Sequence, residues 1–359
     1  CGLNLDMHAL GRAGHAAGWL YAAPDAPEAV ADLLALARGG QGVAVAPLPP
    51  GPAPGAADEA HADAVLDGLR GARIGLVGEH PAGFDTCRYD PDALARLAGV
   101  SVEAISLPDL FGRARAAPAD AVALARSTVE ATLAGADGLD QDQFDRSLRV
   151  FRALDDLARE KDLAGFAVRC WPEMFTDYGC AACGPMGMMA GQGTPCACEA
   201  DVYGALTALL LQGLAVEPSW LVDIVDMDGA GDTGVFWHCG SAPLGMADPA
   251  VQPQVQIHSN RRMPLLAEFT LKPGRITVAR VSQAHNTPRL VLAGAEVLRA
   301  PMSFTGTSGV VRFDRKAGEV AAAMMQEGLE HHVAFAYGEH RPALRAMATR
   351  MGLPVVEIA

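Results

Sequence analysis

The sequence contains no apolar run of the roughly 18 to 20 residues that a membrane-spanning helix requires. Its first residues also lack the basic, apolar and small-residue order of a signal peptide. Basic residues are in the minority, since 28 Lys and Arg against 42 Asp and Glu give a net charge of -14. This charge argues against phosphate-backbone binding. We therefore expect a soluble cytoplasmic protein that binds neither membranes nor nucleic acid.

A phosphate-binding loop is also missing, because the Gly- and Met-rich stretch 184–191 has neither a Lys-Ser/Thr ending nor a G-x-G-x-x-G frame. Half of the 359 residues are hydrophobic, which is enough for ordinary globular cores in two or three domains. The chain begins at Cys1 inside a segment with the pattern of ordered structure. We therefore expect residues upstream of this sequence.

Eight cysteines are few for a chain of this size, and a cytosolic location favours free thiols over disulfides. Six of the eight lie between positions 170 and 239. Two close pairs, Cys180 with Cys183 and Cys196 with Cys198, have spacings that suit a structural zinc site. Buried cysteines that act only as small hydrophobic residues are the alternative interpretation.

The pattern predicts three regions. Residues 1–70 are interpreted as the remnant of an N-terminal α/β domain followed by a Pro-rich linker around 47–55, which cannot continue a helix or a central strand. This region is predicted to hold a short strand at 18–21 and helices at 26–38 and 59–70.

Residues 71–198 alternate between strands and helices, which predicts a central α/β domain with a parallel sheet. The predicted strands are 73–78, 100–107 and 165–171, the predicted helices are 91–98, 118–135 and 141–160, and 179–197 is predicted to be a loop.

Residues 199–359 are predicted to form a β-rich domain that opens with a helix at 199–212. Consecutive strands with few helices between them indicate an antiparallel sheet or partial barrel. Lys272-Pro273-Gly274 is predicted to be a tight turn. The predicted strands are 220–225, 234–238, 265–271, 275–280, 289–292 and 331–338.

Acidic residues stand next to buried segments at two places. Pro172 ends the strand pattern before it, so Glu173 lies just past a strand's carboxyl end, where open α/β sheets bind ligands. Glu199 and Asp201 flank the start of the predicted helix, about 200° apart around its axis, so they are not expected to bind one ion if the helix has begun. A solvated carboxylate or a helix cap is the ordinary alternative for each.

Two histidines, His331 and His332, begin the last predicted strand. Adjacent side chains on a strand face opposite sides, so one of the two is expected to point into a given site. Neutral imidazole suits a transition metal, and carboxylates with one imidazole suit a divalent cation.

Several of these segments together resemble the L-fucose/L-arabinose isomerase family. The resemblance is carried by the Cys-Trp-Pro-Glu segment at 170–173, by 195–206, by Phe236-Trp237-His238-Cys239-Gly240, by the turn at 271–274 and by His331-His332, and it extends from Cys1 to the end. Most of that family's N-terminal domain would be absent. The resemblance implies three domains, a monosaccharide substrate, and a homo-oligomer, trimeric or hexameric, whose neighbouring N-terminal domains help to close the site.

The resemblance further implies manganese-dependent aldose–ketose isomerisation, with Glu173, Asp201 and His332 as metal ligands. His238 is a further candidate for binding metal or substrate, and Glu199 and His331 stay open as alternatives to their neighbours.

Isomerisation moves a proton between C1 and C2, through a cis-enediol, while a divalent cation stabilises the developing oxyanion. Glu173 and Asp201 are predicted to share the acid and base roles. Trp171 and Met186 are predicted to contact the sugar, although a buried core position is equally consistent with Trp171.

Two other functions remain open at this stage. One is a non-catalytic carbohydrate-binding protein whose cysteines hold a structural zinc ion, and the other is a metal-dependent sugar aldolase, which needs the same enediolate stabilisation.

Overall fold

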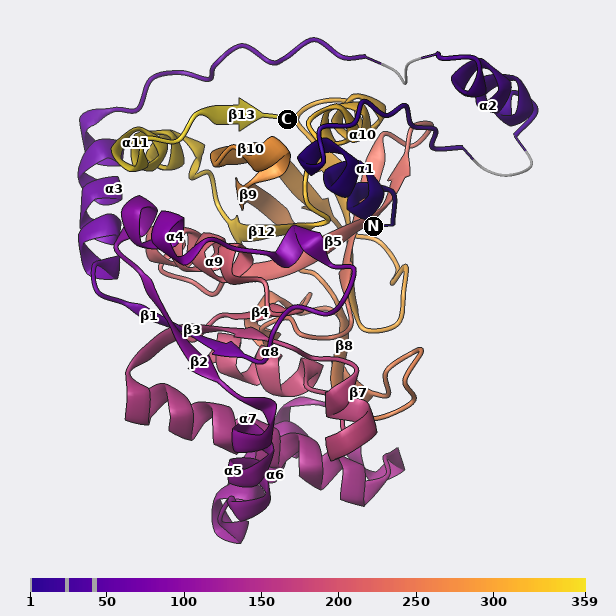
Figure 1. Ribbon diagram of the computed structural model, residues 1–359. Helices are drawn as coiled ribbons and strands as arrows, with labels where there is room; N and C mark the ends of the chain where they lie inside the picture. The colour runs from indigo at the N-terminus through magenta and orange to yellow at the C-terminus, as the bar shows by residue number, and fades with distance from the viewer. Residues whose placement is uncertain (1, 23–25, 41–43) are drawn as a thin grey trace.

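The computed structural model describes residues 2–22, 26–40 and 44–359. In these residues the chain forms two sheets, with helices packed around and between them (Figure 1). The helices are α1 Gly2–Arg12, α2 Ala29–Ala37, α3 Ala56–Leu69, α4 Pro91–Ala98, α5 Leu107–Ala116, α6 Ala119–Thr132, α7 Gln141–Lys161, α8 Cys183–Gly191, α9 Val202–Ala215, α10 Ala317–Gln326 and α11 Arg341–Met351. The strands are β1 Arg73–Val77, β2 Ser101–Ile105, β3 Leu163–Val168, β4 Cys196–Cys198, β5 Trp220–Asp228, β6 Thr233–His238, β7 Gln254–Gln256, β8 Leu266–Thr270, β9 Gly274–Ser282, β10 Arg289–Leu298, β11 Thr307–Phe313, β12 His332–Tyr337 and β13 Val355–Glu357. Short helical turns include η1 Asp85–Cys87, η3 Met174–Tyr178 and η5 Ala284–Asn286.

The smaller sheet is parallel throughout, in the order β2-β1-β3-β4, which confirms the expected parallel α/β organisation. Successive side chains of a strand point to opposite faces, and here each face meets a helix. Phe166 and Val168 of β3 join the core formed with α7, whereas Ala167 joins the core formed with α9. A strand that is covered on both faces must be apolar at nearly every position, as β3 is.

The larger sheet runs β13-β10-β9-β12-β5-β6-β11-β8-β7. An additional pairing joins β10 to β11, so that β10, β9, β12, β5, β6 and β11 form a closed ring of antiparallel neighbours. Closure removes the exposed edges that an open sheet would carry. The predicted β-rich C-terminal region with a partial barrel is therefore confirmed.

Aromatic side chains fill the ring. Phe335 of β12 lies 5.7 Å from Phe236 of β6 and 5.9 Å from Trp220 of β5, measured between ring centroids, and Phe236 also meets Phe313 of β11. Edge-on and tilted contacts at these distances are the favourable arrangements for aromatic rings. Aromatic contacts therefore join β5, β6 and β12, the strands that carry the polar residues described below.

Helix α9 lies between the two sheets and contacts β3 and β4 on one side and β9 and β12 on the other. Nearly every residue from Val202 to Leu211 is buried, because the helix is covered on both sides. Gly204 permits the closest approach: a Cβ there would lie 2.7 Å from Asp201 Oδ2 and 2.9 Å from Leu221 Cδ1. The start of this helix is therefore a close-packed face.

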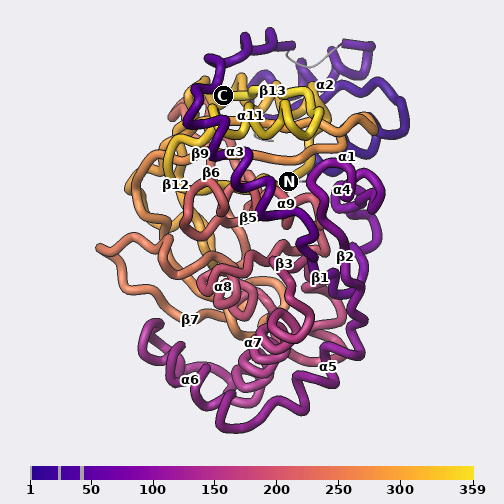
Figure 2. The backbone as a smooth tube through the Cα atoms, turned by 90° about the vertical axis from the view of Figure 1, so that its left-hand side faces the viewer, coloured from indigo at the N-terminus to yellow at the C-terminus, as the bar shows by residue number. Residues whose placement is uncertain are grey.

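The N-terminal segments pack mainly on C-terminal elements. Helix α1 contacts η5, α10 and η1, and α3 contacts α11 and α9. Helix α2 has no buried residue and stands apart from the two sheets in Figure 1. Figure 2 shows the N-terminal and C-terminal segments at the same end of the molecule. The domain boundaries at 70/71 and 198/199 stay predictions.

Several sequence-based expectations need correction. Residues 18–21 belong to no strand in the structure. The segment 179–197, predicted to be a loop, contains α8 and β4. Its glycines serve close packing: a Cβ on Gly184 would lie 2.7 Å from Leu265 Cγ, and one on Gly187 would lie 2.9 Å from the Ala242 carbonyl oxygen. Helix-breaking residues are thus tolerated here because a neighbouring backbone lies against them.

The turn at Lys272-Pro273-Gly274 does connect β8 to β9, but these strands are not neighbours in the sheet. In the part of the chain that the structure describes, no helix is both long and apolar enough to cross a membrane.

Candidate metal centre

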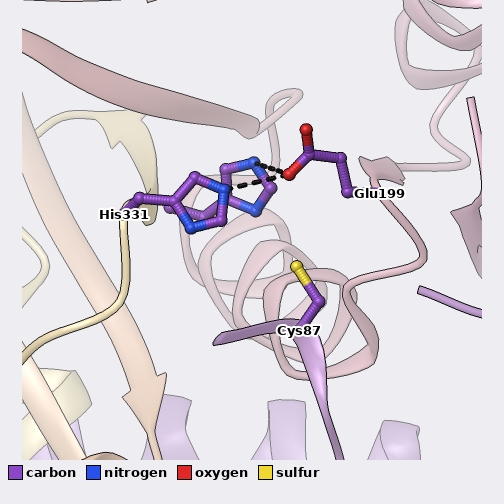
Figure 3. Close-up of side chains that lie close together, drawn as sticks. Cys87, Glu199 and His331 are labelled. Atoms are coloured by element: carbon purple, nitrogen blue, oxygen red, sulfur yellow. Dashed lines mark hydrogen bonds and ion pairs between the residues drawn. The ribbon is translucent and has the colours of Figure 1, made fainter. Parts of the chain in front are cut away.

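Four polar side chains converge where the small sheet, α9 and the strand ring meet. Glu199 follows β4, Asp223 lies on β5, His238 ends β6 and His332 begins β12. Asp223, His238 and His332 form one group, in which a potential ligand atom from each residue lies within 4.8 Å of the others. His332 also belongs to a second group, with Glu199, His331 and Cys87. Figure 3 shows the Glu199 carboxylate against two imidazole rings.

Glu199 occupies a strained connection between β4 and α9. Glu199 and Ala200 both have φ of 58°, in the left-handed region that residues with a Cβ seldom adopt. Two backbone bonds hold this turn: Ala200 N–H donates to the Val168 carbonyl at 3.0 Å, and Asp201 N–H donates to the Cys198 carbonyl at 3.1 Å. Strain of this kind persists only where surrounding structure fixes it, and it gathers at functional sites.

The Glu199 carboxylate receives two hydrogen bonds. The Trp171 indole N–H donates to Oε1 at 3.1 Å, and Nε2 of His331 lies 2.9 Å from Oε2. Burial raises the pKa of Glu199, but the His331 hydrogen bond and the nearby imidazoles outweigh it, so the pKa lies below its ordinary value. Glu199 is therefore an ionised carboxylate at neutral pH, and its side chain is 13% exposed.

The orientation of His332 is fixed by a hydrogen bond at Nδ1, the ring nitrogen that bonds to Asp201. Its Nδ1 lies 2.9 Å from Asp201 Oδ2, so the ring's proton belongs on Nδ1 and the lone pair on Nε2. Nε2 is buried, has no hydrogen-bond partner, and lies 3.6 Å from Glu199 and 4.0 Å from Asp223. Burial, and secondarily His331, lower the pKa of His332, which favours the neutral ring that metals require.

Asp201 is held by a buried arginine. Arg280 donates to both carboxylate oxygens, at 2.5 and 3.0 Å, and both side chains are 1% exposed. Asp201 also accepts from Gly204 N–H at 2.8 Å and so caps α9. Burial opposes ionisation, but the Arg280 charge lowers the pKa of Asp201 far below its ordinary value. With these three partners, Asp201 orients His332, as carboxylates behind metal-binding histidines do.

His238 carries its ring proton on the opposite nitrogen from His332. Its Nδ1 accepts a hydrogen bond from Cys239 N–H at 2.9 Å, which puts the ring proton on Nε2. That Nε2 is buried without a partner, in the same group as Asp223 and His332. With Nδ1 occupied as an acceptor, the ring presents its Nε2–H donor to the cluster.

His331 and Cys87 complete the second group. Both histidines of the pair contact Glu199, so the expectation that only one would point into the site is wrong. His331 lies just before β12, and the alternation of side chains along a strand does not apply to it. His331 Nδ1 lies 2.9 Å from Thr86 Oγ1, so both of its nitrogens are engaged. Burial and the nearby carboxylates raise the pKa of Cys87 well above its ordinary value, which keeps it a neutral thiol.

Glu173 lies outside both clusters. It makes a two-point ion pair with Arg169, four residues earlier, at 2.6 and 2.7 Å. Arg169 also donates to the carbonyl oxygens of Glu79 and His80. The Arg169 hydrogen bonds lower the pKa of Glu173.

The structure places the two predicted substrate contacts differently. Trp171 is half-buried and bonded to Glu199, whereas Met186 is buried in the core on α8. The four cysteines proposed for zinc do not form a ligand group among the described residues. Cys198 instead lies 2.8 Å from Cys170, between sulfur atoms, and Cys183 lies beside Cys239.

Sequence reasoning did not select Asp223, although the signal was present. An acid inside the buried, apolar first part of β5, residues 220–224, is costly to bury unless it is paired or binds a cation. The register partner of Asp223 on the neighbouring strand β12 is His332, the histidine already selected.

The geometry can be set beside known proteins. No family model matches the chain. A sulfoquinovose isomerase from Alkalicoccus urumqiensis is 31% identical over 295 residues, which are 81% of this chain and 66% of that protein. A sulfoquinovose isomerase from Clostridium sp. (strain MSTE9) is 31% identical over 287 residues, 79% of this chain and 64% of that protein.

A third such relative, from Priestia aryabhattai, is 28% identical over 276 residues, 77% of this chain and 62% of that protein. The chain is therefore a relative of sugar isomerases. The particular relatives are named for sulfoquinovose, and the match spans slightly less than two thirds of each of them.

Proposed function

We propose that this chain carries the metal centre of an aldose–ketose isomerase. The observation that supports this most is the pairing of an unpartnered, buried His332 Nε2 with two carboxylates, Glu199 and Asp223. A buried imidazole lone pair between acids is unfavourable unless a cation occupies the space between them. The similarity to proteins named isomerases, over about four fifths of the chain, supports the same reaction class.

Glu199, Asp223 and His332 would hold the metal. Two carboxylates with one imidazole are a donor set for a hard or borderline divalent cation, and Mn²⁺ is the ion that we propose. The ion would supply Lewis-acid stabilisation to the oxygens on C1 and C2, the two carbons between which the proton moves. The ligand roles first predicted for Glu173 and Asp201 thus pass to Glu199 and Asp223, while His332 keeps its role.

The proton transfers fall to groups at the edge of the cluster. Glu199 is the most exposed member of the cluster, and its carboxylate accepts hydrogen bonds from Trp171 and His331. We therefore assign it the transfer of the carbon-bound proton that gives a cis-enediol. His238 presents Nε2–H and is assigned to the hydroxyl proton. Asp201 and Arg280 hold His332 and contact no substrate.

The substrate that we propose is a fucose- or arabinose-like aldose, as in the L-fucose/L-arabinose isomerases that the sequence resembles. A sulfonated sugar related to sulfoquinovose is the specific candidate, because that name stands on all of the similar proteins described above. A cytoplasmic homo-oligomer, trimeric or hexameric, is part of the same proposal.

The decisive experiment measures deuterium uptake at C2 and ketose formation. The full-length protein would be stripped of metal, reloaded with Mn²⁺ and given sulfoquinovose, fucose and arabinose in heavy water. We expect metal-dependent exchange with at least one sugar, abolished by Glu199→Gln. Cleavage products in place of ketose would indicate an aldolase, and no exchange with any sugar would refute the isomerase.

Glu173→Gln is the matched control. It removes the same charge 26 positions earlier in the chain but outside both clusters. Exchange that survives Glu173→Gln and disappears in Glu199→Gln supports the assignment, and the reverse pattern would return the ligand role to Glu173.

A further inference from the structure

An unpaired arginine lies against the tryptophan that holds Glu199. The guanidinium carbon of Arg261 is 5.5 Å from the centroid of the Trp171 ring and 6.0 Å from that of Phe175. The Trp171 indole N–H donates to Glu199. One aromatic side chain therefore contacts both the proposed metal carboxylate and an exposed cation.

Arg261 differs from other arginines near the cluster in having no carboxylate partner among the described residues. Arg169 is paired with Glu173, Arg280 with Asp201 and Arg88 with Asp85. A guanidinium that rests on an aromatic face keeps its N–H donors at the edge, where they match the oxygens of an oxyanion.

The loop that carries Arg261 is held in place. His258 Nδ1 accepts hydrogen bonds from the backbone N–H groups of Asn260 and Arg261, at 3.3 and 3.2 Å. Arg262 N–H donates to the His258 carbonyl at 2.8 Å, and the His258 ring meets Phe175 edge-on at 5.2 Å. The backbone of Arg261 is thus fixed before any ligand binds, which lowers the entropic cost of binding.

We infer that Arg261 recognises an anionic group at the end of the sugar remote from C1 and C2, and that this group is a sulfonate. The inference rests on the proposed isomerase function, since it places C1 and C2 at the metal centre. A tetrahedral oxyanion accepts two parallel N–H bonds from a guanidinium, and a neutral terminal carbon offers no acceptor for them. Arg261 is therefore a specificity-determining residue for the charge of the substrate.

Arg261→Gln and Arg262→Gln form a matched pair for the test. The two arginines are adjacent and exposed, and neither makes an ion pair within the described chain, but only Arg261 contacts the aromatic rings. Each would be assayed with sulfoquinovose, with glucose 6-phosphate and with quinovose, the neutral sugar that lacks the sulfonate.

Arg261→Gln is expected to lower kcat/KM for sulfoquinovose by about 10- to 100-fold, the range for losing a charge-assisted hydrogen bond. Its kcat/KM for quinovose, and both values for Arg262→Gln, are expected to stay at the wild-type level. Equal losses with the charged and neutral sugars, or equal losses in both variants, would overturn the inference. Efficient turnover of glucose 6-phosphate that falls equally in Arg261→Gln would overturn the assignment to a sulfonate.

Binding keeps this inference separate from the isomerase proposal. The sulfonated alditol, which has no carbonyl group and cannot isomerise, would be titrated calorimetrically into each variant, with its neutral counterpart as control. Weaker binding of the sulfonated alditol in Arg261→Gln alone supports the anion site even if no sugar exchanges deuterium. Identical binding in all three proteins would refute it.

Discussion

Two arginine–carboxylate pairs stand in different parts of the molecule and have different consequences. At the end of the parallel sheet, Glu173 and Arg169 are four residues apart, and their side chains are 28% and 19% exposed. Between α9 and the strand ring, Asp201 and Arg280 are 79 residues apart and wholly buried. Only the buried pair also bonds a histidine of the cluster, His332.

The comparison shows that the partner of an acid decides its role. A partly exposed pair within one segment contributes little to stability. In the Glu173 pair, both carboxylate oxygens already accept hydrogen bonds from Arg169. A buried pair must be complete, because either member alone would be an uncompensated charge. Asp201 is therefore fixed tightly enough to orient His332, whereas Glu173 fixes only the loop after β3.

Replacement of a proposed ligand should have the largest effect. Asp223→Asn keeps the shape of the side chain but removes its charge, so we expect Mn²⁺ affinity to fall by more than the roughly 10- to 100-fold that follows loss of an orienting group. Calorimetric titration of the metal-free protein measures this change. Retained affinity in a variant that circular dichroism shows to be folded would contradict the assignment.

Breaking the buried pair should have the next largest effect, on stability as well as affinity. Asp201→Asn leaves Arg280 without a countercharge, so we expect a loss of about 3 to 5 kcal/mol in the free energy of unfolding. Mn²⁺ affinity should also fall, since His332 loses its acceptor, by about 10- to 100-fold. Urea unfolding and calorimetry measure the two effects. Wild-type affinity in Asp201→Asn would refute the positioning role.

A third carboxylate lies between β12 and α11, where Glu339 accepts hydrogen bonds from two arginines, Arg275 and Arg341. Burial opposes ionisation there, but the arginine hydrogen bonds lower the pKa of Glu339 from 4.5 to about 2. Because the folded-state pKa is depressed, the stabilisation is present above pH 4.5 and is lost as the pH falls toward 2. Urea unfolding at several acidic pH values should show a shallower loss of stability in Glu339→Gln than in the wild type. Identical slopes would contradict this.

The exposed pair should have the smallest effect. Glu173→Gln is expected to change the free energy of unfolding by about 1 kcal/mol or less and to leave Mn²⁺ affinity unchanged. Together with Asp201→Asn, this substitution sharpens the comparison between the two pairs. A large loss of metal in Glu173→Gln would erase the distinction.

The sequence predicted the two sheet types because their signals are local. Strands β1, β2 and β3 are apolar segments separated by helical periodicity, and a run of strands follows after residue 220. Helix α8 was not predicted because its glycines ordinarily mark turns. In the fold, the backbones of Leu265 and Ala242 pack against Gly184 and Gly187, where a larger side chain would not fit.

At the site, the sequence predicted which types of residue are present but not which side chains pair with each other. The sequence singled out Glu199 and the histidine pair by their chemistry, and His238 through the family resemblance. It could not show that Arg169 is paired with Glu173 or that Arg280 is paired with Asp201. Those pairings depend on side-chain directions and on contacts across the fold. The closure of β10 on β11 is likewise a long-range pairing with no local signal.

The strained step from β4 to α9 acts as a fixed-length spacer. Cys198 is anchored in a sheet and Asp201 is anchored by a buried arginine, so the two residues between them have one path available. An inserted residue would leave both anchors in place and rotate Glu199 out of register with Asp223 and His332. Changes in chain length during divergence or engineering are therefore expected to accumulate in surface loops, and the Glu-Ala-Asp spacing at 199–201 should be the part of this protein least tolerant of them.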